Sequence, residues 1–417
     1  MKLPTFLFMR IGSVAVLAVL MILAGCSLPD LGTSSSESVN QSDSNSDSDS
    51  SQPPEQITGV LLKQQEGKGN PQRYGSVSVY DACTVLPLKA LTDLGLEHGD
   101  QTDFKARSAV RSIHLAESVP AAVTGVGVLD GVSKCTYSIE GEHISLDIYQ
   151  PPFNAENVLQ RQLEVPTNQG GQFRTEQGVP LAVWQGPSGW YFVIDKQDVV
   201  VQGYLPLEKP NYGNYNLEQL TEEIAKQVIA NLNQGPTAPA QYQYDSPYQG
   251  IPAPCKVVSA EAFEQSFGEP ASGQIEATYY AGEFQTTNFG ITSVPNITTE
   301  CNRSNLVPSG NSNRAYRSVD VKFSHYRDEK WAKSDFKICN PDAPNSDLHQ
   351  AKVLDIEIGD SPVCLTKSNE THNLFNFRVG KTIVQMETWR EDPDNSDPQK
   401  LAQKLEPMAK AIAENLK

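Results

Sequence analysis

Thiol and imidazole groups are the first side chains to consider for chemistry, because both bind metals and act as nucleophiles or bases. The chain of 417 residues has seven cysteines and six histidines. The histidines are scattered, and no two stand at the spacing of a zinc-binding helix or knuckle; they are His98, His114, His143, His325, His349 and His372. We therefore expect no metal site and no cofactor, and we interpret the histidines as exposed or locally hydrogen-bonded.

The only segment that is similar to a serine nucleophile motif is Gly186-Pro187-Ser188-Gly189. It lacks the second glycine of a nucleophile elbow at the required place, and it separates two strand-like runs, 181–184 and 190–194. Pro-Ser-Gly between two strands is typical of a hairpin turn. The alternating Asp355 and Glu357 favour the wet face of a strand over a pair of glycosidase acids. We therefore expect a protein that is not an enzyme.

The aromatic residues Trp184, Trp190 and Tyr191 are the candidate ligand contacts, since all three fall around one expected hairpin. Most large rings belong to cores. A subset exposed beside a cleft would suit an apolar ligand or a glycan, and an apolar cavity there would favour a lipid.

The N-terminus indicates where the protein resides. Lys2 and Arg10 precede an apolar run over 11–23, which ends in Leu23-Ala24-Gly25-Cys26. The pattern predicts a signal peptide over 1–25. The alternatives are an ordinary signal peptide and an uncleaved membrane helix, but the run is shorter than the ~20 residues that span a bilayer.

The four residues Leu23 to Cys26 resemble the lipobox of bacterial lipoproteins. The resemblance implies that the Cys26 sulfur carries a diacylglyceryl group with fatty acyl chains such as palmitate, and that Cys26 is the first residue of the mature protein. Two or more acyl chains hold a protein stably on a bilayer. We therefore expect a lipid anchor in the cell membrane, with the protein on its extracytoplasmic face.

We expect residues 26–56 to form an acylated tether. They are rich in serine and aspartate and contain no aromatic residue, so we expect them to be disordered. The whole chain has 33 Lys and Arg against 50 Asp and Glu, a net charge of −17. A charge of this sign repels phosphate backbones, so we expect no nucleic-acid partner.

The folded part of the chain is an internal repeat, which predicts two domains over 57–235 and 251–417. In each copy one cysteine, Cys83 or Cys255, stands at a short amphipathic helix. A second cysteine, Cys135 or Cys301, lies in a strand or at its beginning. Later in each copy, a pair of strands begins near Tyr191 or Leu374 and precedes a final helix. Apolar residues at helical spacing after Asn216 and after Asp397 predict this final helix in the first and the second copy.

The cysteines after Cys26 are even in number, which indicates three disulfides in an exported chain. Six cysteines permit fifteen pairings. The repeat selects one of them: Cys83 with Cys135 and Cys255 with Cys301 are the same pair twice, which leaves Cys339 to Cys364.

The segment 236–250 is rich in proline and glycine and predicts a linker between the two copies. It contains Tyr242, Tyr244 and Tyr248. Three rings at so short a spacing favour packing against a domain or the inter-domain seam over a mobile hinge.

The first copy resembles a known family. The run Asp81-Ala82-Cys83-Thr84-Val85-Leu86, a leucine-rich helix ending at Gly95, the strand at Cys135-Thr136-Tyr137 and a last helix after a valine-rich hairpin are similar to the actinobacterial lipoproteins grouped as domain of unknown function 3558. The resemblance implies an α+β fold, an antiparallel sheet flanked by helices akin to Mog1 and PsbP, here apparently in two tandem copies. The second copy departs from it by a polar loop after Cys301 and by Cys339 and Cys364.

The expected function is non-catalytic binding in the cell envelope. Two similar modules can bind bivalently or form one joint surface, and the partner would be an envelope protein, a glycan or a lipid. A lipid or glycolipid carrier would require a roomy apolar cavity, and an envelope hydrolase would require convergent polar groups in a pocket.

Overall fold

The computed structural model describes residues 53–96, 109–118, 132–139, 142–151, 156–207, 216–286, 294–305, 317–339, 352–369, 372–388 and 397–417. The predicted signal peptide, Cys26 and the predicted tether up to residue 52 lie outside the described residues. Residues Gln52–Lys417 form one compact unit. Among the described residues, no helix has both the length and the apolar character needed to cross a bilayer.

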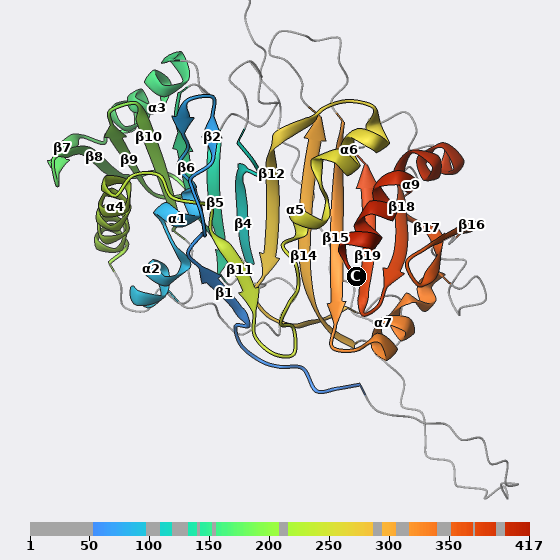
Figure 1. Cartoon of the computed structure of the whole chain (residues 1–417). Helices are drawn as coiled ribbons and strands as arrows, with labels where there is room; N and C mark the ends of the chain where they lie inside the picture. The colour runs from blue at the N-terminus through green and yellow to red at the C-terminus, as the bar shows by residue number, and fades with distance from the viewer. Residues whose placement is uncertain are drawn as a thin grey trace, which may run out of the picture. The chain divides into compact units, whose positions relative to one another are not determined.

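One antiparallel sheet of fifteen strands dominates this described unit (Figure 1). The first half of the chain contributes seven of the strands: β4 (Ala109–Leu115), β5 (Val132–Ile139), β6 (Glu142–Tyr149), β7 (Phe173–Glu176), β8 (Val179–Gln185), β9 (Gly189–Lys196) and β10 (Val199–Pro206). Their order from the centre outward is β4-β5-β6-β10-β9-β8-β7.

The second half contributes the remaining strands: β12 (Ala271–Tyr280), β13 (Phe284–Thr286), β14 (Val294–Asn305), β15 (Ser318–Tyr326), β16 (Lys352–Ile358), β17 (Ser361–Asn369), β18 (His372–Val379) and β19 (Thr382–Thr388). From the centre outward they run β12-β14-β15-β19-β18-β17-β16, and β13 pairs with β14 off this path. Except for β13, the two halves therefore have the same strand order.

The helices repeat in the same way. The first half has α1 (Ala82–Val85), α2 (Leu88–Asp93), α3 (Glu156–Asn168) and α4 (Leu217–Asn233), and the second has α5 (Pro254–Val257), α6 (Ala260–Phe267), α7 (Glu329–Asp335), the 3-10 helix η2 (Phe336–Cys339) and α9 (Pro398–Asn415). Asn216 and Asp397 cap α4 and α9 by accepting hydrogen bonds from backbone N–H groups of the first turn. The two final helices thus begin where the sequence predicts.

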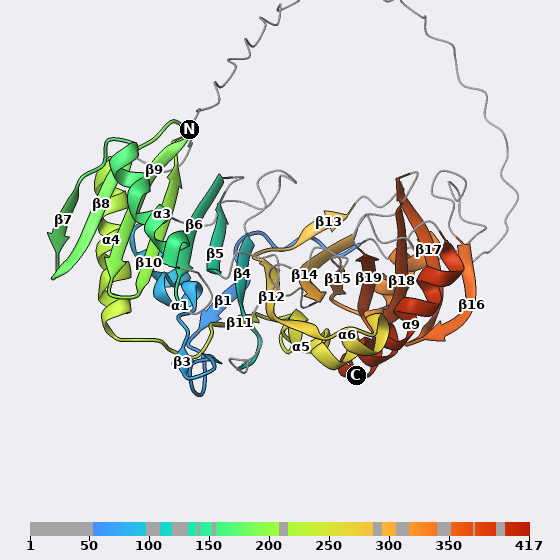
Figure 2. The same ribbon diagram turned by 90° about the horizontal axis from the view of Figure 1, so that it is seen from above.

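Alternating strand residues separate two cores on the two faces of the sheet. Phe192 and Ile194 belong to the main core, which also contains the buried stripe of α4, whereas Val193 packs with Val200 on the side of α3. In the second half, α5, α6 and α9 lie together along one face, as Figure 2 shows, and α7 packs on the other.

The two halves join edge to edge through β4 and β12, with Ser112 opposite Ala277. Ser112 also pairs with Cys135, and Ala277 pairs with Cys301, so Ser112 and Ala277 hold the same position in their halves. A pseudo-two-fold axis therefore passes between them. The sequence predicts a separate sheet for each copy, and the structure corrects this: the first sheet strand of each copy is an unpaired edge until the two edges pair.

A two-stranded ribbon covers this junction. β1 (Leu62–Gln65) comes from the start of the first half, and its partner β11 (Gln241–Tyr244) comes from the expected linker. A smaller hairpin pairs β2 (Arg73–Tyr74) with β3 (Val77–Ser78). Tyr242, Tyr244 and Tyr248 are all buried, and the Tyr242 ring lies 4.5 Å from that of Tyr279 on β12. The predicted packing of the three tyrosines is confirmed, and the segment contributes a strand to the fold.

The fully buried carboxylate of Glu283 holds the start of the described chain. It accepts hydrogen bonds from the Ile57 N–H (2.6 Å), the Tyr248 hydroxyl (2.5 Å) and the Arg327 guanidinium (2.5 and 2.7 Å). Arg327 also donates to the Glu55 carbonyl (2.7 Å). We call Ile57, Tyr248, Glu283 and Arg327 the Glu283 cluster. The contact at Glu55 means that the chain joins the fold before residue 57, where the sequence predicts the end of the tether.

Candidate functional site

The structure brings only two of the three candidate aromatic contacts together. The rings of Trp184 and Tyr191 stack at 5.4 Å with 15° between their planes, on the face covered by α3. Trp190 points to the opposite face and packs against the main core. The three rings therefore do not form one binding surface.

The polar atoms of this aromatic group are used inside the protein. Trp184 Nε1 donates to Gln169 Oε1 (2.8 Å), and the Tyr191 hydroxyl is 2.7 Å from Ser188 Oγ. Ser188 lies in the β8–β9 turn, where the Gly186 N–H donates to the Gly189 carbonyl (2.8 Å). The hairpin interpretation of this serine is confirmed, and Trp184 with Tyr191 forms a packed stack.

The structure contains the disulfides Cys83–Cys135, Cys255–Cys301 and Cys339–Cys364, the pairing that the repeat predicts. The first two connect a short helix to a central strand in equivalent places. The third links η2 to β17 and has no counterpart in the first half.

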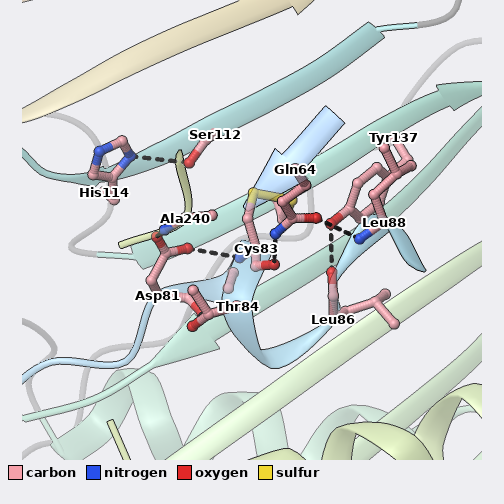
Figure 3. The surroundings of a disulfide bond; sticks show 12 residues. Gln64, Asp81, Cys83, Thr84, Leu86, Leu88, Ser112, His114, Tyr137 and Ala240 are labelled. Carbon is pink, nitrogen blue, oxygen red and sulfur yellow. Dashed lines mark hydrogen bonds between the residues drawn. A yellow bond between two sulfur atoms is a disulfide. The ribbon is translucent and has the colours of Figure 1, made fainter. Parts of the chain in front are cut away.

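The first disulfide lies in a network of backbone caps, which Figure 3 shows. Asp81 caps α1: its Oδ1 accepts from the Cys83 N–H (2.7 Å), and its Oδ2 accepts from the Ala240 N–H (3.0 Å). At the other end of α1, the Tyr137 hydroxyl donates to the Leu86 carbonyl. Tyr137 stands two residues after Cys135, and Leu86 stands three after Cys83.

Arg303 fills the equivalent place in the second half. It stands two residues after Cys301, and its Nε donates to the carbonyl of Val258, three residues after Cys255. Its Nη2 also donates to the Cys255 carbonyl at 3.3 Å. A guanidinium has five N–H donors against the one of a phenol, so Arg303 has donors left after it makes the bond that Tyr137 makes.

A cavity of about 960 Å³ lies at the junction, between the β1–β11 ribbon and the central strands. Arg303, His114 and Ile275 lie in one row across β14, β12 and β4, and all three line it. Cys255, Lys256 and Ser259 line it from the segments at α5 and α6. Further lining residues come from the ribbon and its flanks: Lys63, Gln65, Lys68, Asn70, Gln72, Gln241, Tyr242, Gln243 and Asp245. We call this space the junction cavity.

The charged residues of the lining are mostly cations. The lining contains four cations, Lys63, Lys68, Lys256 and Arg303, and two carboxylates, Glu117 and Asp245. Lys63 binds Asp245 at 2.7 Å. Among the described residues, no ion pair joins Lys68 or Lys256 to a carboxylate. The junction cavity is therefore locally positive, in a chain whose net charge is −17.

Arg303 is the buried charge of this cavity, with only 4% of its surface exposed. Burial lowers the pKa of its guanidinium to about 10, against the opposing effect of Glu117, so the group stays cationic at neutral pH. Its Nη1 is buried and has no hydrogen-bond partner among the described residues. The same holds for the hydroxyl of Tyr242, whose pKa burial raises well above its usual value. Two residues of the lining thus each have a buried donor without an acceptor in the described part of the chain.

Among the residues that line the cavity, His114 is the one whose imidazole could act as a general acid or base. Its Nδ1 lies 2.9 Å from the Ser112 hydroxyl, and burial lowers the pKa of the imidazole, while Asp81 raises it. Ser112 is only 2% exposed, and both Asp81 oxygens accept backbone N–H groups. A serine so buried does not meet a substrate, so the pair fits a structural role better than nucleophilic catalysis.

Sequence reasoning missed the junction cavity and its central residue Arg303. The signal was present in the repeat: the residue two after the strand cysteine is Tyr137 in the first copy and Arg303 in the second. Charged residues are rarely buried without a partner. When one copy has a charged residue where the other has a buried aromatic residue, the two copies differ there in bonding or in function. Within the described residues, no three His, Cys, Asp or Glu side chains are grouped to hold a metal ion.

Comparison with known proteins gave no relative: no family model, no curated protein and no solved structure matches the chain.

Proposed function

We propose that this protein is a lipid-anchored binding protein of the cell envelope and that the junction cavity is its ligand site. The anchor is proposed from Leu23-Ala24-Gly25-Cys26 and the apolar run before it. The three disulfides of the described part suit a compartment that oxidises thiols.

The observation that carries the binding function is the junction cavity, with a buried cation whose Nη1 has no acceptor in the described fold. Ligand sites are concave, reach about 300–1,000 Å³, and place a few polar groups at fixed points. Leaving a charged donor unpaired costs stability, and a bound acceptor removes that cost.

We further propose that the two halves are tandem copies of one Mog1- and PsbP-like fold, related to the lipoprotein family that the first copy resembles. The shared strand order, the equivalent disulfides and the equivalent caps on α1 and α5 support this proposal.

The lining of the junction cavity favours a polar ligand over a lipid. Lysines, glutamines and Asn70 form much of the wall along the ribbon and its flanks, and these groups disfavour an acyl chain. The buried Ser112 likewise disfavours a hydrolase.

The anchor is tested by growing cells that express the full chain with labelled palmitate. We expect the wild type to be labelled and recovered with membranes, and Cys26→Ala to be unlabelled. Ser27→Ala is the matched control, because it changes the neighbouring residue and leaves the thiol in place. Equal labelling of Cys26→Ala would refute the anchor.

The binding function is tested on the full chain extracted in mild detergent from its own envelope, by native mass spectrometry. We expect a bound mass that Ala277→Phe removes, because Ala277 lines the junction cavity and a phenyl ring would fill part of it. Val353→Phe, at an exposed position of the edge strand β16, is the control. A bound mass that Ala277→Phe leaves unchanged would place the site elsewhere.

A further inference from the structure

We propose that the junction cavity recognises an anionic group of its ligand, which accepts hydrogen bonds from Nη1 of Arg303. The inference rests on the proposed binding function and names the ligand chemistry of that site. The shared chemistry is an oxyanion, either on a free small molecule or on a larger envelope component.

The first argument is the hydrogen-bond inventory of Arg303. Nε is satisfied by the Val258 carbonyl and Nη2 by the Cys255 carbonyl, which fixes the guanidinium plane. Nη1 has no partner in the described residues. A fixed guanidinium with an unused edge is pre-organised for an oxyanion, since little rotamer entropy remains to be lost on binding.

The second argument is the comparison with the first half. Tyr137 makes the equivalent cap with one hydroxyl and leaves no donor over. The cap alone therefore does not require a guanidinium at this position. The additional donors and the positive charge of Arg303 are therefore available for another role, and Arg303 is one of the residues that line the cavity.

The third argument is the charge around Arg303. Lys68 and Lys256 line the same cavity, and among the described residues neither is paired with a carboxylate. The two lining carboxylates are Glu117 and Asp245, and Asp245 is bound to Lys63. Cations that line a concave site with low-dielectric walls concentrate anions there, even on a protein that is acidic overall.

The unused hydroxyl of Tyr242 adds a neutral donor to the same lining. A ligand with an anionic group and a further acceptor would satisfy both buried donors, whereas a neutral apolar ligand would satisfy neither.

The test uses the full chain with ¹³C,¹⁵N-labelled arginine. Inorganic phosphate and citrate are titrated separately at constant ionic strength, with chloride and glucose as controls. We expect a saturable shift of the Arg303 side-chain resonance with at least one of the two oxyanions and no saturable shift with chloride or glucose.

The decisive variant is Arg303→Tyr, which places the residue of the first half in the second. It is designed to retain a donor for the Val258 carbonyl while it removes Nη1, so it separates binding from folding. We expect the affinity for the oxyanion, measured by calorimetry, to fall roughly ten- to hundredfold. Lys256→Gln keeps Arg303 and is expected to weaken binding only a few-fold.

Should Arg303→Tyr fail to fold, Tyr242→Phe and Lys256→Gln give the same test from the other lining groups, because Tyr242→Phe removes a hydroxyl that has no hydrogen-bond partner among the described residues. Unchanged affinity in both of these variants, or no saturable shift with either oxyanion, would overturn the inference. A neutral molecule co-purifying in the cavity would overturn it while the proposed binding function stands. If the full chain carries no bound mass and neither oxyanion binds, both proposals fail.

Discussion

The two halves of the sheet solve the same capping problem with different residues. In the first half, the phenol of Tyr137 closes the cysteine helix at Leu86, and in the second half the guanidinium of Arg303 closes it at Val258. The bond is the same, but the charge and the number of spare donors differ. The comparison teaches that a repeated scaffold tolerates a change at a capped position, provided that one donor remains for the carbonyl.

A second difference lies on the pseudo-two-fold axis itself. Arg111 precedes Ser112, and Glu276 precedes Ala277, so these two residues hold equivalent positions. They form an ion pair across the junction. Two identical halves would place like charges there, which repel. Divergence at this position therefore favours the edge-to-edge pairing of β4 and β12.

Removal of a disulfide is expected to lower the unfolding free energy more than any other change that compares the two halves. Removing Cys83–Cys135 by paired alanine substitutions, or Cys255–Cys301 in the same way, opens loops with separations of 52 and 46 residues. Chain entropy predicts a loss of about 4 kcal/mol in each case. Urea unfolding of both double variants measures it.

The two losses should agree within about 1 kcal/mol if the disulfides are equivalent. The Cys339–Cys364 pair, with a separation of 25 residues, is the internal reference and should cost slightly less. A loss in one half but not in the other would break the comparison.

The next effect is a pH dependence that comes from His325 in the second half. His325 is buried between the hydroxyls of Thr299 and Thr382, each 3.1 Å away, and burial lowers the pKa of its imidazole to about 3, with a smaller contribution from Lys381. Because the unfolded chain binds the proton near pH 6.5, the stabilising contribution is complete above that pH and is lost as the pH falls toward 3.

The expected loss from His325 is about 3 kcal/mol between pH 7 and pH 4. The equivalent position in the first half is Gln150, since His325 and Gln150 each stand four residues after the partner of the strand cysteine, Val321 or Leu146. His325→Gln should therefore reduce the pH slope of the unfolding free energy. An unchanged pH slope of the unfolding free energy in His325→Gln would show that His325 does not cause the pH dependence.

A smaller effect is expected from the cap of the first half. Tyr137→Phe leaves the Leu86 carbonyl unpaired in a buried place, which costs about 1–3 kcal/mol. Arg303→Tyr, which is designed to keep the cap, should change the unfolding free energy less than Tyr137→Phe does. Thermal unfolding of the two variants side by side compares them, and a larger loss in Arg303→Tyr would show that its charge is needed for folding.

The smallest effect is expected at the junction. Glu276→Arg places two arginines across the axis and should destabilise the protein by about 1 kcal/mol, less at high salt, because Arg111 is nearly half exposed. Glu276→Gln is the neutral control. Urea unfolding at low and high salt measures the difference, and a salt-independent loss would point to packing rather than charge.

The repeat, the disulfide pairing and the burial of the linker tyrosines could be predicted from the sequence because each depends on spacing or composition. Cysteine positions and the strand pair near Tyr191 and Leu374 are periodic, and the register confirms that Phe192 and Phe375 hold the same place. The predicted α+β class, with helices beside an antiparallel sheet, is confirmed by the strands and helices of the structure.

The single sheet and the junction cavity could not be predicted, because both depend on residues brought together by the pairing of β4 with β12. Residues 109–115 and 271–280 are mixed in polarity, so neither indicates a partner strand. The unused donor of Arg303 exists only because its other nitrogens find two carbonyls of the α5 region. No local sequence pattern predicts how many hydrogen bonds the Arg303 guanidinium makes.

The Glu283 cluster has a mechanical consequence. Two residues of the second half hold the start of the described chain: Glu283 accepts from the Ile57 N–H, and Arg327 donates to the Glu55 carbonyl. The chain then goes on to build the first half. If the N-terminus is fixed at Cys26 as proposed, a force that drags the molecule from its support acts first on this cluster. The load then passes into the second half at the β12–β13 turn, and β1 and the first cysteine helix are shielded from being peeled away strand by strand.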